Sequence, residues 1–216
     1  MSIENLKHKK SAQALWPRTE RRRATQYDKK KEAILQTSAM LFKTNGYDQV
    51  SINDVADYLK ITKPTIYYYL GNKDLILLEI KRLVQTETLR VLREAKAMEC
   101  SGYEKLQFLI PEYVKILATD FGGCFVRTMH VRMAKESQEE VVSRSVEGNR
   151  IMNDIIVDGQ NDGSLAVEQP AVTTLTLLGA LNWTAYWYEP GRSISLEELG
   201  RSQAHILLNG ISGKAR

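Results

Sequence analysis

Apolar and polar side chains follow one another along this chain with the period of an α-helix, and no stretch shows the two-residue alternation of a strand. The pattern is clearest after Ser51, which forms with Asp54 an acidic version of the capping box that begins a helix. The apolar positions that follow are spaced as one buried face of a two-turn helix: Ile52, Val55, Ala56 and Leu59. The pattern predicts an all-α fold.

A second short helix is predicted from Lys63 to Leu70, after a turn at residues 60–62. Pro64 lies in its first turn, where a proline is tolerated. Apart from Ile66 and Leu70, this helix has little to bury, and its other side chains are cationic, aromatic or hydroxyl-bearing. A short, thinly anchored polar helix of this kind fits a DNA major groove. The alternative is an ordinary α-hairpin in a helical bundle.

A longer helix is predicted to begin after Asn72 and to continue to about Ala97. Lys73 lies in its first turn, where a positive charge opposes the helix dipole, and a DNA phosphate would explain its presence. We expect three residues to approach bases: Lys63, Thr65 and Tyr68. We expect phosphates to be held by Ser51, Thr62, Tyr67 and Lys73, with Pro64 in the same interface.

These segments resemble the DNA-binding domain of the tetracycline-repressor-like (TetR/AcrR) regulators. The resemblance covers about residues 27–78, and four motifs in order carry it: IL-x5-LF-x3-G from Ile34, S-I-x2-V-A from Ser51, I-T-K-x-T-I-Y-Y-Y from Ile61 and G-N-K-D-L from Gly71. Lys60 departs from the family, which often has glycine in this turn. The resemblance implies a homodimeric regulator that binds a palindromic double-stranded DNA operator.

Charge is concentrated at the amino terminus. The chain has a net charge of +4, but residues 1–31 hold ten Lys or Arg and only three acidic residues. A basic arm beside a helix-turn-helix is typical of a nucleic-acid binder, although a solvated tail has the same composition. We therefore divide the chain into a basic arm (1–25), a helix-turn-helix domain (26–80) and a ligand-binding and dimerisation domain (81–216).

The rest of the chain is predicted to be helical. Capping boxes begin at Ser101, Ser137 and Ser195. Gly122-Gly123 is predicted as a loop beside an amphipathic segment that reaches Lys135. Helices are expected over residues 26–45, from Ser101, from Ser137 to Asn161, over 171–188 and over 196–209. The inward side chains of the helix after Ser137 are expected to include Val142, Val146, Met152, Ile155 and Ile156.

The last two predicted helices carry small residues that permit close helix approach. These are Gly179, Ala180, Gly200 and Ala204, with leucine and isoleucine around them. Such positions suit a four-helix dimer interface, and they serve a core within one chain equally well. The family resemblance favours the dimer.

Four aromatic side chains lie within six residues of the first of these helices: Trp183, Tyr186, Trp187 and Tyr188. They are explained either by ordinary packing or by the wall of a ligand cavity with Asn182 as a polar anchor. The segment also resembles, more loosely, the carboxyl-terminal domain of family members that respond to acyl-coenzyme A. The candidate ligand-binding residues are Tyr113, Phe125, Met129, Met133, Asn182, Trp183 and Trp187.

No set of side chains for catalysis, a cofactor or a metal can be assembled. The histidines His8, His130 and His205 lie in three unrelated segments, and no nucleophile, phosphate-loop or zinc motif is present. No apolar run is long enough for a membrane span, and no secretory signal is recognised, so a cytoplasmic protein is expected. The sequence favours a repressor released by a small amphipathic effector such as an acyl-coenzyme A. The alternatives are a DNA-binding dimer without an effector and a helical enzyme.

Overall fold

The computed structural model describes residues 26–191 and 194–211, so the basic arm predicted at residues 1–25 lies outside the described part. Within these ranges every regular element is a helix, which confirms the all-α prediction. The helices are α1 (Gln26–Asn45), α2 (Ile52–Leu59), α3 (Lys63–Leu70), α4 (Lys73–Ala97), α5 (Gly102–Leu117), α6 (Asp120–Arg127), α7 (Lys135–Asn161), α8 (Pro170–Trp187) and α9 (Leu196–Asn209).

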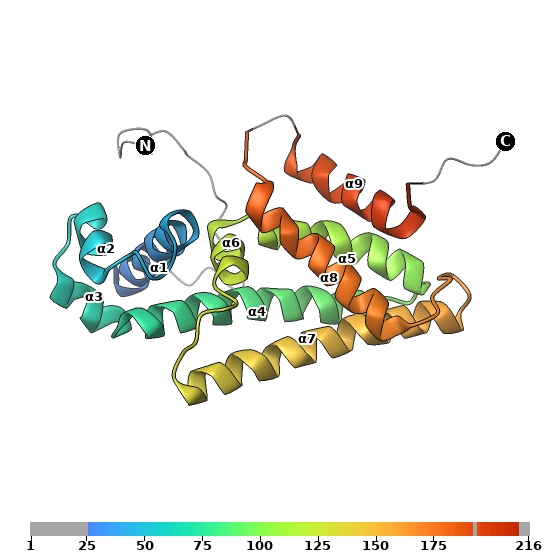
Figure 1. Cartoon of the computed structure of the whole chain (residues 1–216), viewed down its shortest axis with the longest axis horizontal. Helices are drawn as coiled ribbons and strands as arrows, with labels where there is room; N and C mark the ends of the chain where they lie inside the picture. Colours follow the sequence, from blue (N-terminus) through green and yellow to red (C-terminus); the bar gives the residue numbers. More distant parts are fainter. Residues whose placement is uncertain (1–25, 192–193, 212–216) are drawn as a thin grey trace.

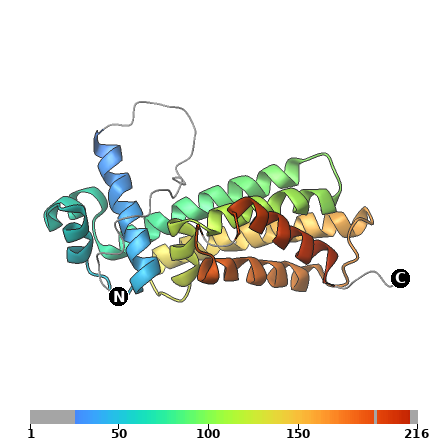
Figure 2. The same cartoon turned by 90° about the horizontal axis from the view of Figure 1, so that it is seen from above.

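The helices form a small unit at one end and a layered bundle along the rest of the molecule. Figure 1 shows α1, α2 and α3 grouped at the start of α4, which continues into the bundle of α5, α7, α8 and α9. Figure 2 shows that α4, α7 and α8 follow the long direction of the molecule, whereas α1 crosses it. Because α4 belongs to both parts, the two parts share one continuous rod.

The short helices α2 and α3 begin and end as the sequence predicts. Ser51 and Asp54 form the capping box in both directions, and Ile66 and Leu70 are the buried residues of α3. Lys60 ends α2 in the left-handed conformation, with φ 55° and ψ 42°. The turn therefore keeps a geometry that glycine adopts at lower cost, although a lysine occupies it.

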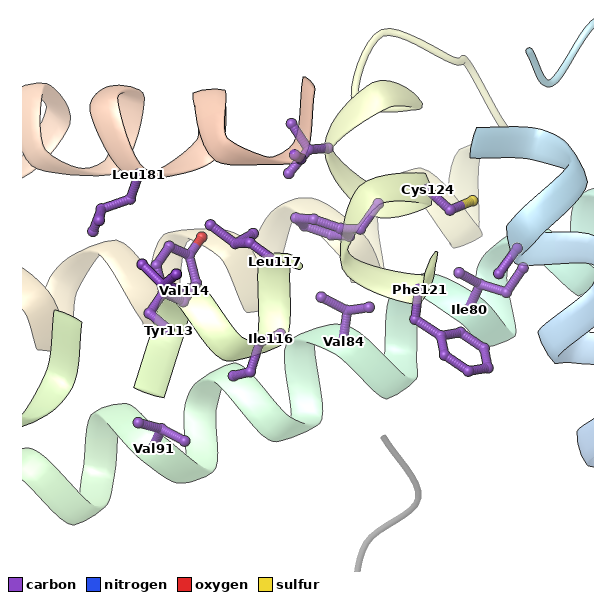
Figure 3. Packing of buried hydrophobic residues seen from close by; sticks show 14 of the residues in the cluster. Ile80, Val84, Val91, Tyr113, Val114, Ile116, Leu117, Phe121, Cys124 and Leu181 are labelled. Atoms are coloured by element: carbon purple, nitrogen blue, oxygen red, sulfur yellow. The ribbon is translucent and has the colours of Figure 1, made fainter. Parts of the chain in front are cut away.

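One apolar core runs through the bundle and into the small unit. Figure 3 shows side chains of α4, such as Ile80 and Val84, packed against Leu117 of α5 and Phe121 of α6. Cys124 of α6 is fully buried in the same cluster, and burial raises the pKa of its thiol to about 12. The core is thus continuous across the junction between the two parts.

The prediction of a loop at Gly122-Gly123 is wrong, because both glycines lie within α6 and are buried. A Cβ atom at Gly122 would lie 2.2 Å from the carbonyl oxygen of Ile116 and 2.7 Å from the Cα of Leu117. Glycine is present here to let α6 fold back closely on the end of α5, and not to open a loop. The amphipathic segment predicted to reach Lys135 ends as a helix at Arg127.

The capping box predicted at Ser137 is also wrong. Helix α7 begins earlier, at Lys135, with Ala134 as its N-cap and no side-chain cap. The Glu140 carboxylate that should have completed the box instead accepts two hydrogen bonds from Arg82 of α4, at 2.7 and 2.6 Å. A two-point ion pair between helices outcompetes a local cap at this position.

Two of the five inward positions predicted on α7 face outward: Val142 is 48% exposed and Val146 is 60% exposed. The neighbouring face of the helix meets α4, where the buried Gln85 amide donates to Val141 O at 2.8 Å and to Ser145 Oγ at 2.9 Å. Hydrogen bonding to a buried amide therefore fixes the rotation of this half of α7. The three remaining predictions, Met152, Ile155 and Ile156, are correct.

No helix among residues 26–191 and 194–211 is long and apolar enough to cross a membrane.

The close approach of α6 to α5 yields a stability prediction. Gly122→Ala should lower the free energy of unfolding by about 1–3 kcal/mol, because the added methyl meets backbone atoms that cannot move aside independently. Gly148→Ala on α7 is the matched control, since its Cβ would make an ordinary 3.5 Å contact with Leu92. The control should be neutral or stabilising by up to about 1 kcal/mol. Urea titrations at one protein concentration, followed by circular dichroism, measure both, and equal stabilities would contradict the packing described here.

Candidate nucleic-acid interface and effector site

The outer face of α3 presents aromatic and cationic side chains, and few buried residues anchor the helix. The helix is held by Ile66 and Leu70, whereas Tyr68 is 74% exposed and Tyr67 45% exposed. The Lys63 ammonium lies 5.8 Å from the centre of the Tyr67 ring, so a cation and an aromatic ring share the surface. Such a face attracts phosphates and offers hydrogen-bonding and apolar contacts to base edges.

The amino-terminal end of α3 carries two threonine hydroxyls. Thr62 is the N-cap residue, but its side chain does not bond to the helix backbone, and its Oγ1 lies 2.8 Å from Oγ1 of Thr65. Pro64 beside them is exposed. Because the helix dipole is positive at this end, the site is electrostatically suited to an anion such as a DNA phosphate.

The other two predicted phosphate contacts already have partners within the chain. The Lys73 ammonium lies 4.0 Å from the centre of the Tyr47 ring, and the Tyr47 hydroxyl donates to Asp74. Burial, reinforced by the Asp74 contact, raises the pKa of Tyr47. The Ser51 hydroxyl donates to Asp54 at 2.7 Å and lowers the pKa of that carboxyl. Both remain near the surface of the small unit, and their role at phosphates stays a prediction.

The sequence reasoning missed Tyr27, which lies at the start of α1 and is 42% exposed. Its ring meets Tyr69 at 4.6 Å and Tyr68 at 6.1 Å between ring centres. It therefore supports the rings of Tyr68 and Tyr69 from α1, a helix that begins 37 residues before α3. An exposed aromatic directly after the basic arm was the available signal.

Two of the predicted ligand-binding residues, Tyr113 and Phe125, are buried between α5, α6 and α8, and Asn182 beside them is half-buried. Tyr113 is buried, its hydroxyl donates to Asn182 Oδ1 at 2.9 Å, and burial raises the pKa of the phenol. Phe125 is buried close to the same helices. The polar anchor that the sequence proposed for a ligand thus makes its hydrogen bond to a neighbouring tyrosine.

The remaining four predicted ligand residues are not gathered around that pair. Met129, Trp183 and Trp187 are 53%, 61% and 46% exposed, and Met133 is partly buried against the core. In this arrangement the seven residues do not line one shared cavity. The tryptophans occupy the outside of α8 instead.

The outer surface of α8 is mostly apolar. Its exposed side chains include Val172 (55%), Leu175 (63%) and Trp183 (61%), and a Cβ at Gly179 would meet nothing within 4 Å. An exposed stripe of several large apolar side chains marks a site of contact with another surface. The small residues of α9 are not part of such a stripe, because they face other helices of the same chain.

Two small residues of α9, predicted at a dimer interface, are part of the core within one chain. A Cβ at Gly200 would lie 3.0 Å from the Cα of Pro111 in α5, and Ala204 is 5% exposed. Gly200 and Ala204 are therefore part of the close packing of α9 on α5. The other two small residues of that prediction, Gly179 and Ala180, are exposed on α8. Their place at a dimer interface stays a prediction.

An open groove of about 360 Å³ lies where the small unit meets the bundle. It is bordered by the end of α1 and the following loop, by the residues after α6 and by the end of α8; its side chains include Lys43, Tyr47, Arg127, His130 and Tyr186. Lys43 is paired with Asp120 at 3.1 Å.

Comparison with known proteins identifies both parts of the chain. The family described as bacterial regulatory proteins, tetR family, matches residues 34–80, and the tetracyclin repressor-like C-terminal domain matches residues 99–211. The fatty acid metabolism regulator protein of Bacillus subtilis is 21% identical over 184 residues, which cover 84% of this chain and 95% of that protein.

Solved structures agree with this match. A transcriptional regulator of the TetR/AcrR family from Thermobifida fusca is 30% identical, with a TM-score of 0.65 over 86% of this chain and 100% of that one. The structure of AibR in complex with isovaleryl coenzyme A and operator DNA has a TM-score of 0.73 and 19% identity, over 82% of this chain and 97% of that one. Because AibR is only 19% identical to this chain, its similarity shows the fold alone.

Proposed function

The chain belongs to the TetR family of DNA-binding transcriptional regulators, which act as homodimers, and from this premise we propose that it is a repressor released by a small amphipathic effector. The observation that carries the DNA-binding part is the exposed face of α3, a helix that buries only Ile66 and Leu70. Because the family regulates transcription in bacteria, where DNA lies in the cytoplasm, we place the protein there. An enzymatic role has no support from the family or its relatives.

The reading of DNA is assigned to the outward residues of α3. Lys63, Thr65 and Tyr68 would approach base edges, while Thr62 and Tyr67 would lie against the phosphates on either side. Ser51 would contribute at the start of α2 and Pro64 would lie against the sugar-phosphate backbone. The Lys73 ammonium, which lies over the Tyr47 ring, would donate to a phosphate with its remaining N–H groups.

The homodimer is proposed to form through α8. Its outer stripe is apolar and exposed in a single chain, and Gly179 at the centre allows another helix to approach closely. Trp183 and Trp187 then belong to the dimer face and not to the wall of a ligand cavity. This assignment leaves α9 to cover α5 within each protomer.

The effector site is proposed between α5, α6 and α8, around Tyr113, Phe125 and Asn182, with Met129 and Met133 at its outer edge. Two similarities favour an acyl thioester: the fatty acid metabolism regulator, and AibR, which was solved with isovaleryl coenzyme A. A polar group at the centre of an apolar interior suits a ligand with one carbonyl on an aliphatic chain. Release of DNA would follow if the ligand prefers the arrangement in which the two α3 helices no longer match successive major grooves.

The base-reading role of α3 can be tested with a duplex selected from a random pool by the wild-type dimer. Lys63→Ala should weaken binding to this duplex by about 2–6 kcal/mol, because each of the two protomers loses one base contact worth about 1–3 kcal/mol, while binding to random duplexes changes little. Lys115→Ala, an exposed lysine on α5, is the matched control and should bind both as the wild type does. Fluorescence anisotropy measures all six affinities, those of the wild type included. Equal losses on selected and random DNA would assign Lys63 to a phosphate.

The dimer face can be tested with one charge. Leu175→Glu should raise the dimer dissociation constant roughly 100-fold or more, because two leucines lose burial worth about 1.5–3 kcal/mol each. Val142→Glu places the same charge on an exposed valine of α7 and should leave the dimer intact. Sedimentation equilibrium distinguishes the two. A stable Leu175→Glu dimer would move the interface away from α8.

The effector class can be tested by calorimetry with a series of acyl-coenzyme A thioesters of increasing chain length. One thioester should bind per protomer and should weaken operator binding at least tenfold, which needs a preference of about 1.4 kcal/mol for the released state. Met133→Glu should abolish this binding while leaving affinity for the selected duplex unchanged. If no thioester binds a dimer that still binds the duplex, the acyl assignment fails and the alternative without an effector is favoured.

A further inference from the structure

One arginine joins the ends of two helices that are far apart in the sequence. Arg127, the last residue of α6, donates from Nη1 to the carbonyl oxygen of Lys43 at 3.0 Å, from Nε to that of Ala185 at 3.3 Å, and from Nη2 to that of Tyr186 at 3.1 Å. Lys43 lies in the last turn of α1, and the other two residues lie in the last turn of α8.

These carbonyls are the ones that a helix leaves without partners. The last four carbonyl groups of an α-helix have no N–H in the following turn, and they form the negative end of its dipole. A guanidinium carries five N–H donors in a rigid plane and a permanent positive charge, so it satisfies several such groups at once. A lysine ammonium has no such planar fork and could not bridge both helix ends in the same way.

The same side chain also reaches toward the proposed dimer face. The guanidinium carbon of Arg127 lies 5.2 Å from the centre of the Tyr186 ring, and that ring stacks on Trp183 with 4.9 Å between centres and 26° between planes. Trp183 is 61% exposed on the outer stripe of α8. Contacts therefore run without interruption from the outside of α8 to the end of α1.

Helix α6 is itself held firmly at both ends. At its start, Asp120 accepts hydrogen bonds from Lys43 Nζ at 3.1 Å and from Gln36 at 3.2 Å, both on α1. Just after its end, the carbonyl oxygen of Thr128 accepts a hydrogen bond from the buried Lys81 of α4 at 2.9 Å. A change at α8 thus meets a rigid element that already contacts α1 and α4.

We propose that Arg127 is a positioning residue that couples the dimer face on α8 to α1, and so fixes the orientation of each DNA-binding unit relative to the dimer axis. The proposal rests on the proposed function, because orientation matters only where two recognition helices must enter major grooves about one helical turn, roughly 34 Å, apart. Without Arg127 each unit keeps its own fold and its own DNA contacts. What it loses is the fixed spacing to its partner.

The spacing of half-sites is the measurement that separates this role from a general structural one. The probes are the duplex selected by the wild-type dimer, versions with one to three base pairs added or removed at its centre, and a duplex with one half-site. The wild type should prefer one spacing sharply. Arg127→Gln should lose at least tenfold in affinity for that spacing, bind the altered spacings nearly as well, and bind the single half-site as the wild type does.

Two further variants complete the design. Arg127→Lys should fall between the wild type and Arg127→Gln, because it retains the charge without the fork. Arg150→Gln replaces an exposed arginine on α7 that pairs with Asp154; it is the matched control and should keep the wild-type preference. Tyr186→Leu leaves the backbone carbonyls in place and removes the ring between Trp183 and Arg127, so it should flatten the preference in part.

Each outcome of these binding measurements either supports the proposal or overturns it. A folded Arg127→Gln dimer with the wild-type spacing preference overturns the proposal, and so does an equal loss on the half-site and the full site, which would indicate general damage to the fold. If Arg127→Gln does not fold, an unaltered preference in Tyr186→Leu overturns it. If the wild type selects no duplex at all, the proposed function fails and the coupling role falls with it, whereas a sharp wild-type preference that survives Arg127→Gln refutes the coupling alone.

Discussion

The structure depends on the burial of α4 along both parts of the molecule. Its first turns close the core of the small unit through Ile76 and Ile80, and its later turns pack through Val84 and Val91 against α5 and α7. At 25 residues the helix is roughly 37 Å long. Because one rod is buried in two places, the DNA-reading unit cannot reorient unless α4 shifts against the bundle. The side-chain links to α6, from Lys81 on α4 and from α1, restrict that shift.

The first half of the chain was predictable because its signals are local. The capping box at Ser51, the proline in α3 and the cap at Asn72 each act within four residues, and the predicted bounds of α1 to α4 agree with the structure. The errors came where a distant partner overrides a local signal. Arg82 takes the carboxylate of Glu140 from its expected cap, and Gln85 turns α7 so that two valines face outward. No pattern within one segment reveals the helix that will pack on it.

The aromatic cluster on α8 shows why the candidate effector site was only partly predictable. A ligand wall, a core and a dimer face all require apolar side chains at helical spacing, so the sequence could not distinguish these three roles. The structure separates them by exposure: Tyr113 is buried and bonded to the half-buried Asn182, while Trp183 is exposed. Asn182, the polar residue predicted to anchor a ligand, accepts a hydrogen bond from Tyr113, and its role toward a ligand stays a prediction. The linking role of Arg127 could not be predicted from the sequence, because its hydrogen-bond partners are backbone carbonyls of two distant helices.

The hydrogen bond between Tyr113 and Asn182 also limits which ligands can open the bundle. Separating α5 from α8 without replacing this bond leaves a buried hydroxyl or amide unsatisfied, which costs about 1–3 kcal/mol. A hydrocarbon alone would incur that cost, whereas a ligand with a carbonyl on an aliphatic chain can accept from the Tyr113 hydroxyl and restore the bond. An opened bundle would also displace the end of α8, where the carbonyls of Ala185 and Tyr186 meet the guanidinium on α6. The polar anchor and the arginine junction thus lie on the same helix, 3–4 residues apart, within one turn. A ligand that pushes on one must move the other.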